Sequence, residues 1–92
     1  MSLANEKIYL RAQGMPWQKI DDQVLILNPS VGEAHELNDS AGLIWEALDG
    51  SNTLDQVKQL YLGAYDTVQE QALEDIQFVI EEFEKLGLVK CQ

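Results

Sequence analysis

Short apolar runs separated by turn formers mark the first part of the chain. From Trp17 to Leu37, β-branched and aromatic residues recur in runs of four or five, and Asp, Asn, Pro or Gly residues lie between the runs. This pattern is typical of β-strands joined by tight turns. Asp21-Asp22 predicts a tight hairpin turn. Three short antiparallel strands are predicted, near 17–20, 23–27 and 33–37.

The spacing of apolar residues becomes helical from residue 38 onward, with apolar positions three and four residues apart. Asn38 or Asp39 is expected to cap a first helix that ends at Asp49-Gly50. A second helix is predicted to begin at Thr53, because its hydroxyl and the Gln56 side chain have the spacing of a capping box.

A third and longer helix is predicted to begin at Thr67, with Glu70 as its capping-box partner, and to run to Leu86, with Gly87 as the stop. Its apolar stripe centres on Ile76. A small sheet cannot bury its own apolar face, so the helices must cover it. The fold class is therefore predicted as α+β, a three-stranded antiparallel sheet followed by three helices, in the shape of a winged helix-turn-helix.

One domain is expected, because 92 residues suit a single small core. We assign the domain to residues 1–92, with a core of 17–89 and an N-terminal arm of 1–16. Within the arm, residues 8–11 have the composition of an additional extended segment. Trp45, on the apolar face of the first helix, is the expected anchor of the core.

The charge balance narrows the class of partner. The chain contains sixteen Asp and Glu residues and six Lys and Arg residues, which gives a net charge of −10. The negative electrostatic potential of such a chain argues against a nucleic acid as partner and favours a basic partner. The single cysteine, Cys91, is consistent with a reducing compartment, and no apolar run reaches the length of a membrane span. A cytoplasmic protein that binds no membrane is expected.

The residue types needed for catalysis are sparse. His35 is the only histidine and is read as a strand-surface residue, and with Cys91 it would supply only two of the four ligands of a zinc site. The glutamates at 81, 82 and 84 fan around the helix instead of converging. The six glycines form no phosphate-binding loop. We expect a protein that is not an enzyme and holds no cofactor or metal.

An ordered set of motifs resembles the PqqD family, the small pyrroloquinoline quinone biosynthesis protein D and its relatives. Residues 37–54 contain Leu-Asn at a strand end, a small-residue turn, Ile-Trp, Asp-Gly and a Thr-hydrophobic helix start. The likeness continues through Asp75-Ile76, Val79-Ile80 and Phe83 to Leu-Gly-Leu-Val at 86–89. It covers about residues 17–89. Phe78 departs from the family pattern, which has a polar residue there.

The resemblance implies a winged-helix-like module that binds the leader of a ribosomally made precursor peptide and presents it to a radical SAM or other peptide-modifying enzyme. The family binds the leader as an added strand between its third strand and its third helix, which here map onto 33–37 and 68–86. An open sheet edge suits such pairing. The precursor, the enzyme and the product are not implied, so the pathway need not be that of pyrroloquinoline quinone.

Side-chain selection is expected from one side of the third helix, beside the Ile76 line. From Asp66 to Glu84 there are seven carboxylates and no Lys or Arg, so the leader is predicted to be basic and its binding to weaken with salt. The predicted peptide-binding residues are Glu33, Ala34, His35, Glu36 and Leu37 of the strand, and Leu73, Gln77, Ile80 and Glu84 of the helix.

Two other functions stay open at this stage. A winged-helix DNA-binding regulator would need 54–63 as its recognition helix, in which Lys58 is the only cation. A protein–protein scaffold, or a homodimer, could use Phe78, which lies roughly opposite Ile76 on the helix. Phe78 could equally pack under the N-terminal arm. Trp17 could cover the core or contact a peptide.

Overall fold

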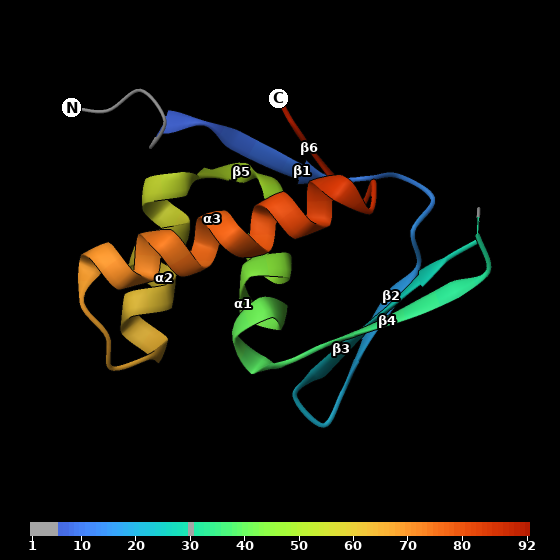
Figure 1. The fold of residues 1–92 in the computed structure, drawn as a ribbon, viewed down its shortest axis with the longest axis horizontal. Helices are drawn as coiled ribbons and strands as arrows, with labels where there is room; N and C mark the ends of the chain where they lie inside the picture. Colours follow the sequence, from blue (N-terminus) through green and yellow to red (C-terminus); the bar gives the residue numbers. More distant parts are fainter. Residues whose placement is uncertain (1–5, 30) are drawn as a thin grey trace.

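Two three-stranded antiparallel sheets and three helices make up the part of the chain that the computed structural model describes, residues 6–29 and 31–92. The predicted α+β class is confirmed. In Figure 1 the β2-β3-β4 sheet projects away from the helices, whereas β1 lies above α3. The elements are β1 (Ile8–Arg11), β2 (Trp17–Ile20), β3 (Gln23–Asn28), β4 (Glu33–Leu37), α1 (Asp39–Ala47), β5 (Asp49–Thr53), α2 (Leu54–Ala64), α3 (Gln69–Lys85) and β6 (Val89–Cys91).

The β2-β3-β4 sheet confirms the three predicted strands, with β3 one residue longer than expected. Asp21 and Asp22 have φ of 51° and 68°, and Ile20 pairs with Gln23 across them. Positive φ at both central residues defines a type I′ turn, whose twist matches that of the flanking strands. Since β3 is central, β2 and β4 are the edges of this sheet.

A second sheet, in the order β5-β1-β6, was only partly predicted from the sequence. The extended segment at residues 8–11 is confirmed and is the central strand, with Tyr9 buried in the core. Strands β5 and β6 were not predicted. The segment after α1 pairs with β1 instead of forming only a turn, and the last residues of the chain pair with the other edge of β1.

Two of the three predicted helix starts are confirmed. The Asn38 side chain accepts a hydrogen bond from the Ala41 N–H at 2.9 Å, and Thr53 and Gln56 form both bonds of the capping box. The start at Thr67 is wrong: α3 begins at Gln69, its N-cap is Val68, and no side chain caps it. The Thr67 N–H donates to the Tyr65 carbonyl at 3.1 Å, so this residue belongs to the preceding turn.

The end of α3 is fixed by a Schellman motif. Gly87 has φ of 73°, the Leu88 N–H donates to the Phe83 carbonyl at 2.9 Å, and the Gly87 N–H donates to the Glu84 carbonyl at 3.0 Å. Leu88 and Phe83 are both buried in the core. The helix stop predicted at Gly87 is confirmed, and the reversal carries the chain into β6.

One core joins the helices to both sheets. Trp45 is fully buried, as predicted, and packs edge-on against Phe83 with ring centroids 5.5 Å apart. Trp17, 37% exposed, packs edge-on with Trp45, with ring centroids 6.2 Å apart, and therefore covers part of the core. Leu60 and Leu86 have the spacing of apolar-stripe residues in the second and third helices, but they are 50% and 45% exposed.

Arg11 links β1 to α1. Its guanidinium donates to the carbonyls of Trp45 and Glu46, each at 2.9 Å, at the end of α1 where the helix dipole favours a cation. The same group lies 5.1 Å from the ring centroid of Trp17 and 5.8 Å from that of Trp45. Arg11 therefore has a structural role, because its guanidinium joins β1 to the end of α1.

Gly50 allows the close approach of β5 to β1. It has φ of 88°, and a Cβ atom there would lie 2.9 Å from Leu10 Cδ1. Gly50→Ala is expected to lower the free energy of unfolding by about 2–3 kcal/mol, from backbone strain and overlap together. Gly14→Ala is the control, since Gly14 has φ of 78° with nothing within 4 Å of a new Cβ. Equal losses in urea unfolding would contradict a contribution from the Leu10 contact.

Candidate functional site

A groove runs between β4 and α3, with a volume of about 440 Å³. Its wall on the sheet side is the edge strand β4, and its other wall is the second half of α3. Most of the lining side chains are apolar, and Phe78, at 65% exposed, stands at its rim. The β4–α3 groove is lined by Ala34, His35, Glu36, Leu37, Asn38, Ala41, Phe78, Val79, Glu82, Phe83, Leu86 and Leu88.

Two residues of β4 direct their backbone N–H and C=O groups toward the open edge of the sheet. In an antiparallel pair, the N–H and C=O of one residue point to the same side, and successive residues alternate. The Leu27 N–H donates to the Pro16 carbonyl at 2.8 Å, so Leu27 and Leu25 face β2, and Ile26 faces β4. Because Ile26 pairs with His35, the outward-facing backbone groups of β4 belong to Ala34 and Glu36.

The side chains of β4 alternate between the two faces of the sheet. His35 and Leu37 lie on the same face as Ile26 and Val24, their buried partners on β3, and therefore point toward the helices. His35 is half-buried, which corrects its assignment as a surface residue, and its Nε2 is buried with no hydrogen-bond partner among the described residues.

The predicted residues of α3 lie on the other side of the helix from this groove. Gln77, Ile80 and Glu84 line a separate cavity together with Lys7 and Tyr9 of the N-terminal arm. Leu73, half-buried, lies one turn before Gln77 on the same side. The groove thus includes four of the five predicted β4 residues, all but Glu33, and the four predicted helix residues do not line it. Their contact with a peptide stays a prediction.

The residues that α3 does present to β4 were missed as a set. They are Phe78, Val79, Glu82, Phe83 and Leu86. The helical periodicity contained a signal for three of them, because Val79, Phe83 and Leu86 have the spacing of the apolar stripe that centres on Ile76. For Phe78, an exposed contact and packing under the N-terminal arm had been equal alternatives.

A second cavity, of about 330 Å³ and with both polar and apolar lining residues, adjoins the end of the groove, where β4 passes into α1. Tyr61 donates its hydroxyl hydrogen to Asp75 Oδ2 at 3.1 Å, and Gln71 donates to Asp75 Oδ1 at 2.9 Å. Burial, and then the hydrogen bond to Asp75, raise the pKa of Tyr61 above its ordinary value. The Asp75 cavity is lined by Asn38, Ser40, Ala41, Ile44, Tyr61, Asp75, Phe78 and Val79.

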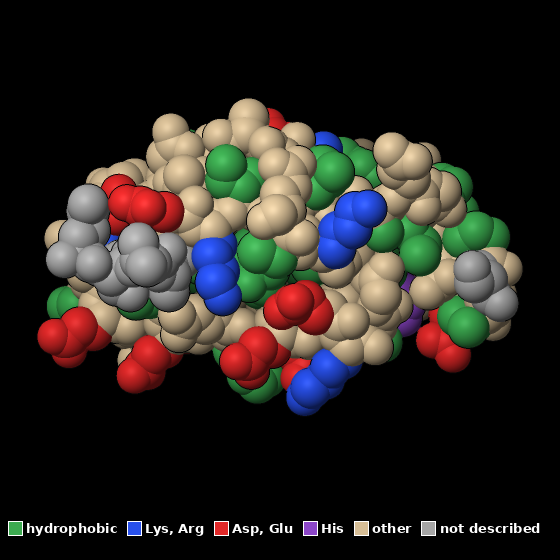
Figure 2. All heavy atoms as spheres, turned by 90° about the horizontal axis from the view of Figure 1, so that it is seen from above, with side chains coloured by type: hydrophobic (Ala, Val, Ile, Leu, Met, Phe, Trp, Pro, Cys, Tyr) green, Lys and Arg blue, Asp and Glu red, His purple; other side chains and the backbone are tan. Residues whose placement is uncertain are grey.

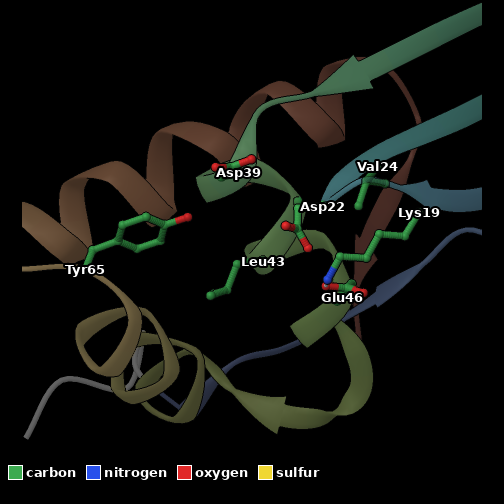
Figure 3. Close-up of a pocket in the computed structure, with 8 residues that line it drawn as sticks. Lys19, Asp22, Val24, Asp39, Leu43, Glu46 and Tyr65 are labelled. Atoms are coloured by element: carbon green, nitrogen blue, oxygen red, sulfur yellow. The ribbon is translucent and has the colours of Figure 1, made fainter.

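An acidic cavity of about 250 Å³ lies elsewhere, between α1 and the β2-β3 turn (Figure 3). Asp22, Asp39 and Glu46 line it, and Lys19 lies 3.4 Å from a carboxylate oxygen of Glu46. Within residues 6–29 and 31–92, no group of three or more His, Cys, Asp or Glu side chains is placed to hold a metal ion. This cavity therefore offers a charged surface and no metal centre.

Most acidic side chains of α3 do not line the β4–α3 groove. Glu70, Glu74, Glu81 and Glu84 are exposed, and acidic side chains appear along one margin of the molecule when it is seen from above (Figure 2). At the groove, Glu82 is paired with Lys85, with 3.4 Å between the charged atoms. None of the helices described is long and apolar enough to cross a membrane.

Two solved structures share this fold. The chain is similar to TbiB1, solved in complex with the TbiA(beta) leader peptide, with a TM-score of 0.82 and 16% identity over 88% of this chain and 94% of that one. It is also similar to lasso peptide synthetase B1 complexed with the leader peptide, with a TM-score of 0.80 and 22% identity over 89% and 96% of the two chains.

No curated protein sequence matches the chain. Residues 23–89 match the family described as Coenzyme PQQ synthesis protein D (PqqD). The matched segment begins at β3, includes all three helices and ends at the first residue of β6. Since it covers well over half of the 92 residues, the chain belongs to the PqqD family.

Proposed function

We propose that this protein is a noncatalytic module that binds the leader of a ribosomally made precursor peptide as a strand added to β4. It presents the peptide to a modifying enzyme, for which a radical SAM enzyme is the leading candidate. One observation carries the proposal: the backbone groups of Ala34 and Glu36 face outward at an edge strand that borders an apolar groove. An extended peptide would satisfy those groups.

The comparisons support a peptide as the occupant. Both similar structures were solved with a leader peptide, and the chain belongs to the PqqD family. In an added strand, alternate side chains would enter the groove, where apolar residues such as Val79, Phe83 and Leu88 favour apolar partners. The net charge of −10 favours a basic leader, whose binding weakens as salt rises.

Catalysis by this chain alone has little support at the groove. Its one imidazole, on His35, has a buried Nε2 with no hydrogen-bond partner in the described part of the chain. A nucleophile activated by a base needs such a contact. We therefore assign the chemistry to the partner enzyme.

The DNA-binding alternative is disfavoured by the charges of α2. Its only cation, Lys58, lies 3.1 Å from a carboxylate oxygen of Asp55 on the same helix. Phosphate contacts by Lys and Arg supply most nonspecific affinity for DNA. A duplex-binding assay at low salt is expected to show no complex.

Titration of isotope-labelled protein with the leader of the precursor encoded beside its gene tests the proposal. Backbone amide signals are expected to shift in 33–37, because the added strand would pair with β4, and at Val79 and Glu82 of α3, because these two residues line the groove. Shifts confined to Gln77, Ile80 and Glu84 would instead place the peptide on the opposite side of α3. No shift at millimolar peptide would contradict the proposed function.

A further inference from the structure

The β4–α3 groove and the Asp75 cavity adjoin each other. Asn38, Ala41, Phe78 and Val79 line both. A peptide that pairs with β4 and continues past Leu37 would therefore pass the opening of the Asp75 cavity. The cavity is a subsite that such a peptide could use, so this inference rests on the proposed function.

Asp75 brings to this cavity a carboxylate with which none of the described Lys and Arg side chains forms an ion pair. Its two carboxylate oxygens accept hydrogen bonds from Tyr61 and Gln71, which are neutral donors. Among the described residues, which include all six Lys and Arg, no ion pair joins a cation to Asp75. The nearest cation in sequence, Lys85, is paired with Glu82 at the far end of the groove.

The rest of the cavity suits the stem of a long basic side chain. Ala41, Ile44 and Val79 supply apolar walls, and Phe78 exposes its ring at the opening. Methylene groups of Lys or Arg pack on such surfaces while the charged end reaches a polar group. A cation beside the Phe78 ring would gain a further attraction.

We propose that the Asp75 cavity receives a Lys or Arg side chain of the bound leader, which pairs with the Asp75 carboxylate. Asp75 and Phe83 are separated by two turns of α3, a rise of about 12 Å. An extended peptide covers that distance in about four residues. The leader is therefore expected to carry a basic residue about four positions from the apolar residue that packs on Phe83.

Peptide selection by the whole protein tests this inference without knowledge of the natural precursor. The probe is a phage-displayed library of random 15-residue peptides, selected in parallel on wild type, Asp75→Asn and Glu74→Gln. Glu74 is the matched control because it is exposed and adjacent on α3. Circular dichroism and the amide spectrum establish that each variant is folded.

Wild type and Glu74→Gln are expected to enrich Lys or Arg at a fixed spacing from an apolar residue, and Asp75→Asn is expected to keep the apolar preference but lose the basic one. Replacing that Lys by norleucine in a selected peptide should weaken binding to wild type about tenfold or more. The same replacement should leave binding to Asp75→Asn nearly unchanged.

Two outcomes would overturn the inference. Peptides selected without a basic residue at a fixed position, or with the same basic preference on Asp75→Asn, would reject the Asp75 subsite and leave leader binding intact. Failure to select any peptide on wild type would reject peptide binding itself, and the subsite with it.

Discussion

Trp45→Ala is expected to lower the free energy of unfolding by about 3–5 kcal/mol, the usual cost of emptying a large aromatic site in a core. Trp45 is fully buried and makes edge-type ring contacts with both Phe83 and Trp17. The same substitution would also remove the contact of the Arg11 guanidinium with the Trp45 ring, whose centroid lies 5.8 Å away. The total free energy of unfolding of a small domain is only about 5–15 kcal/mol.

Trp17→Ala is the matched control. Trp17 is 37% exposed and covers one side of Trp45, so its removal is expected to cost no more than about 2 kcal/mol. Each variant keeps one tryptophan, and urea unfolding followed by fluorescence can measure both. Equal losses in the two variants would contradict the assignment of Trp45 as the core anchor.

Trp45→Ala should also weaken peptide binding in the β4–α3 groove. Phe83 packs on Trp45 with one side of its ring and lines the β4–α3 groove. Without Trp45, Phe83 is free to turn into the vacated space. Where Trp45→Ala remains folded, its affinity for a leader peptide is therefore expected to fall more than that of Trp17→Ala.

Elements with local chemistry were predictable from the sequence. Asp21-Asp22 adopts the positive φ of a type I′ turn, and Asn38 and Thr53 cap their helices as expected. In each case the groups that stabilise the structure lie within four residues of one another. The failed prediction, at Thr67, had the right spacing to Glu70, but its backbone closes a turn onto Tyr65 instead.

The second sheet could not be predicted in the same way, because its pairing is not local. β5 contains Asp, Gly and Asn, which have low strand propensity, and it forms because β1 lies beside it. The Leu54 N–H donates to the Lys7 carbonyl at 2.9 Å, and the Gln92 N–H donates to the Ile8 carbonyl at 2.8 Å. Both contacts join segments that are far apart in the sequence.

The non-local origin of these contacts also explains why the helix residues of the groove were not predicted from the sequence. Helical periodicity divides α3 into two sides around Ile76, but it does not state which side faces β4. That choice follows from the β1 strand, which lies beside Gln77 and Ile80 and leaves Val79 and Glu82 to face β4. The residues of β4 were accessible to sequence reasoning because an edge strand follows from hairpin order and the family resemblance.

Ala34→Pro is expected to weaken leader binding about 100-fold or more while the protein stays folded. The Ala34 N–H faces the open edge of β4, so proline removes a donor to the added strand and no bond to β3. A peptide carbonyl left unpaired there costs about 1–3 kcal/mol, and the ring also obstructs close approach of the added strand.

Two controls separate the missing N–H from other effects of proline. Ala34→Val adds similar bulk and keeps the N–H, so it should bind a leader peptide much better than Ala34→Pro. Lys19→Pro places proline at the opposite edge of the same sheet. The Lys19 N–H also faces outward there, because its partner Val24 directs its own backbone groups toward β4. This variant gives up only an exposed ion pair with Glu46.

Calorimetric titration of wild type and the three variants with one leader peptide, beside urea unfolding of each, measures the comparison. Lys19→Pro is expected to bind like wild type, since β2 is not the edge that faces α3. If Ala34→Pro also binds like wild type, the peptide does not pair with β4. If Ala34→Pro and Lys19→Pro lose affinity equally, the loss reflects damage to the sheet, because only one of the two prolines lies in the groove.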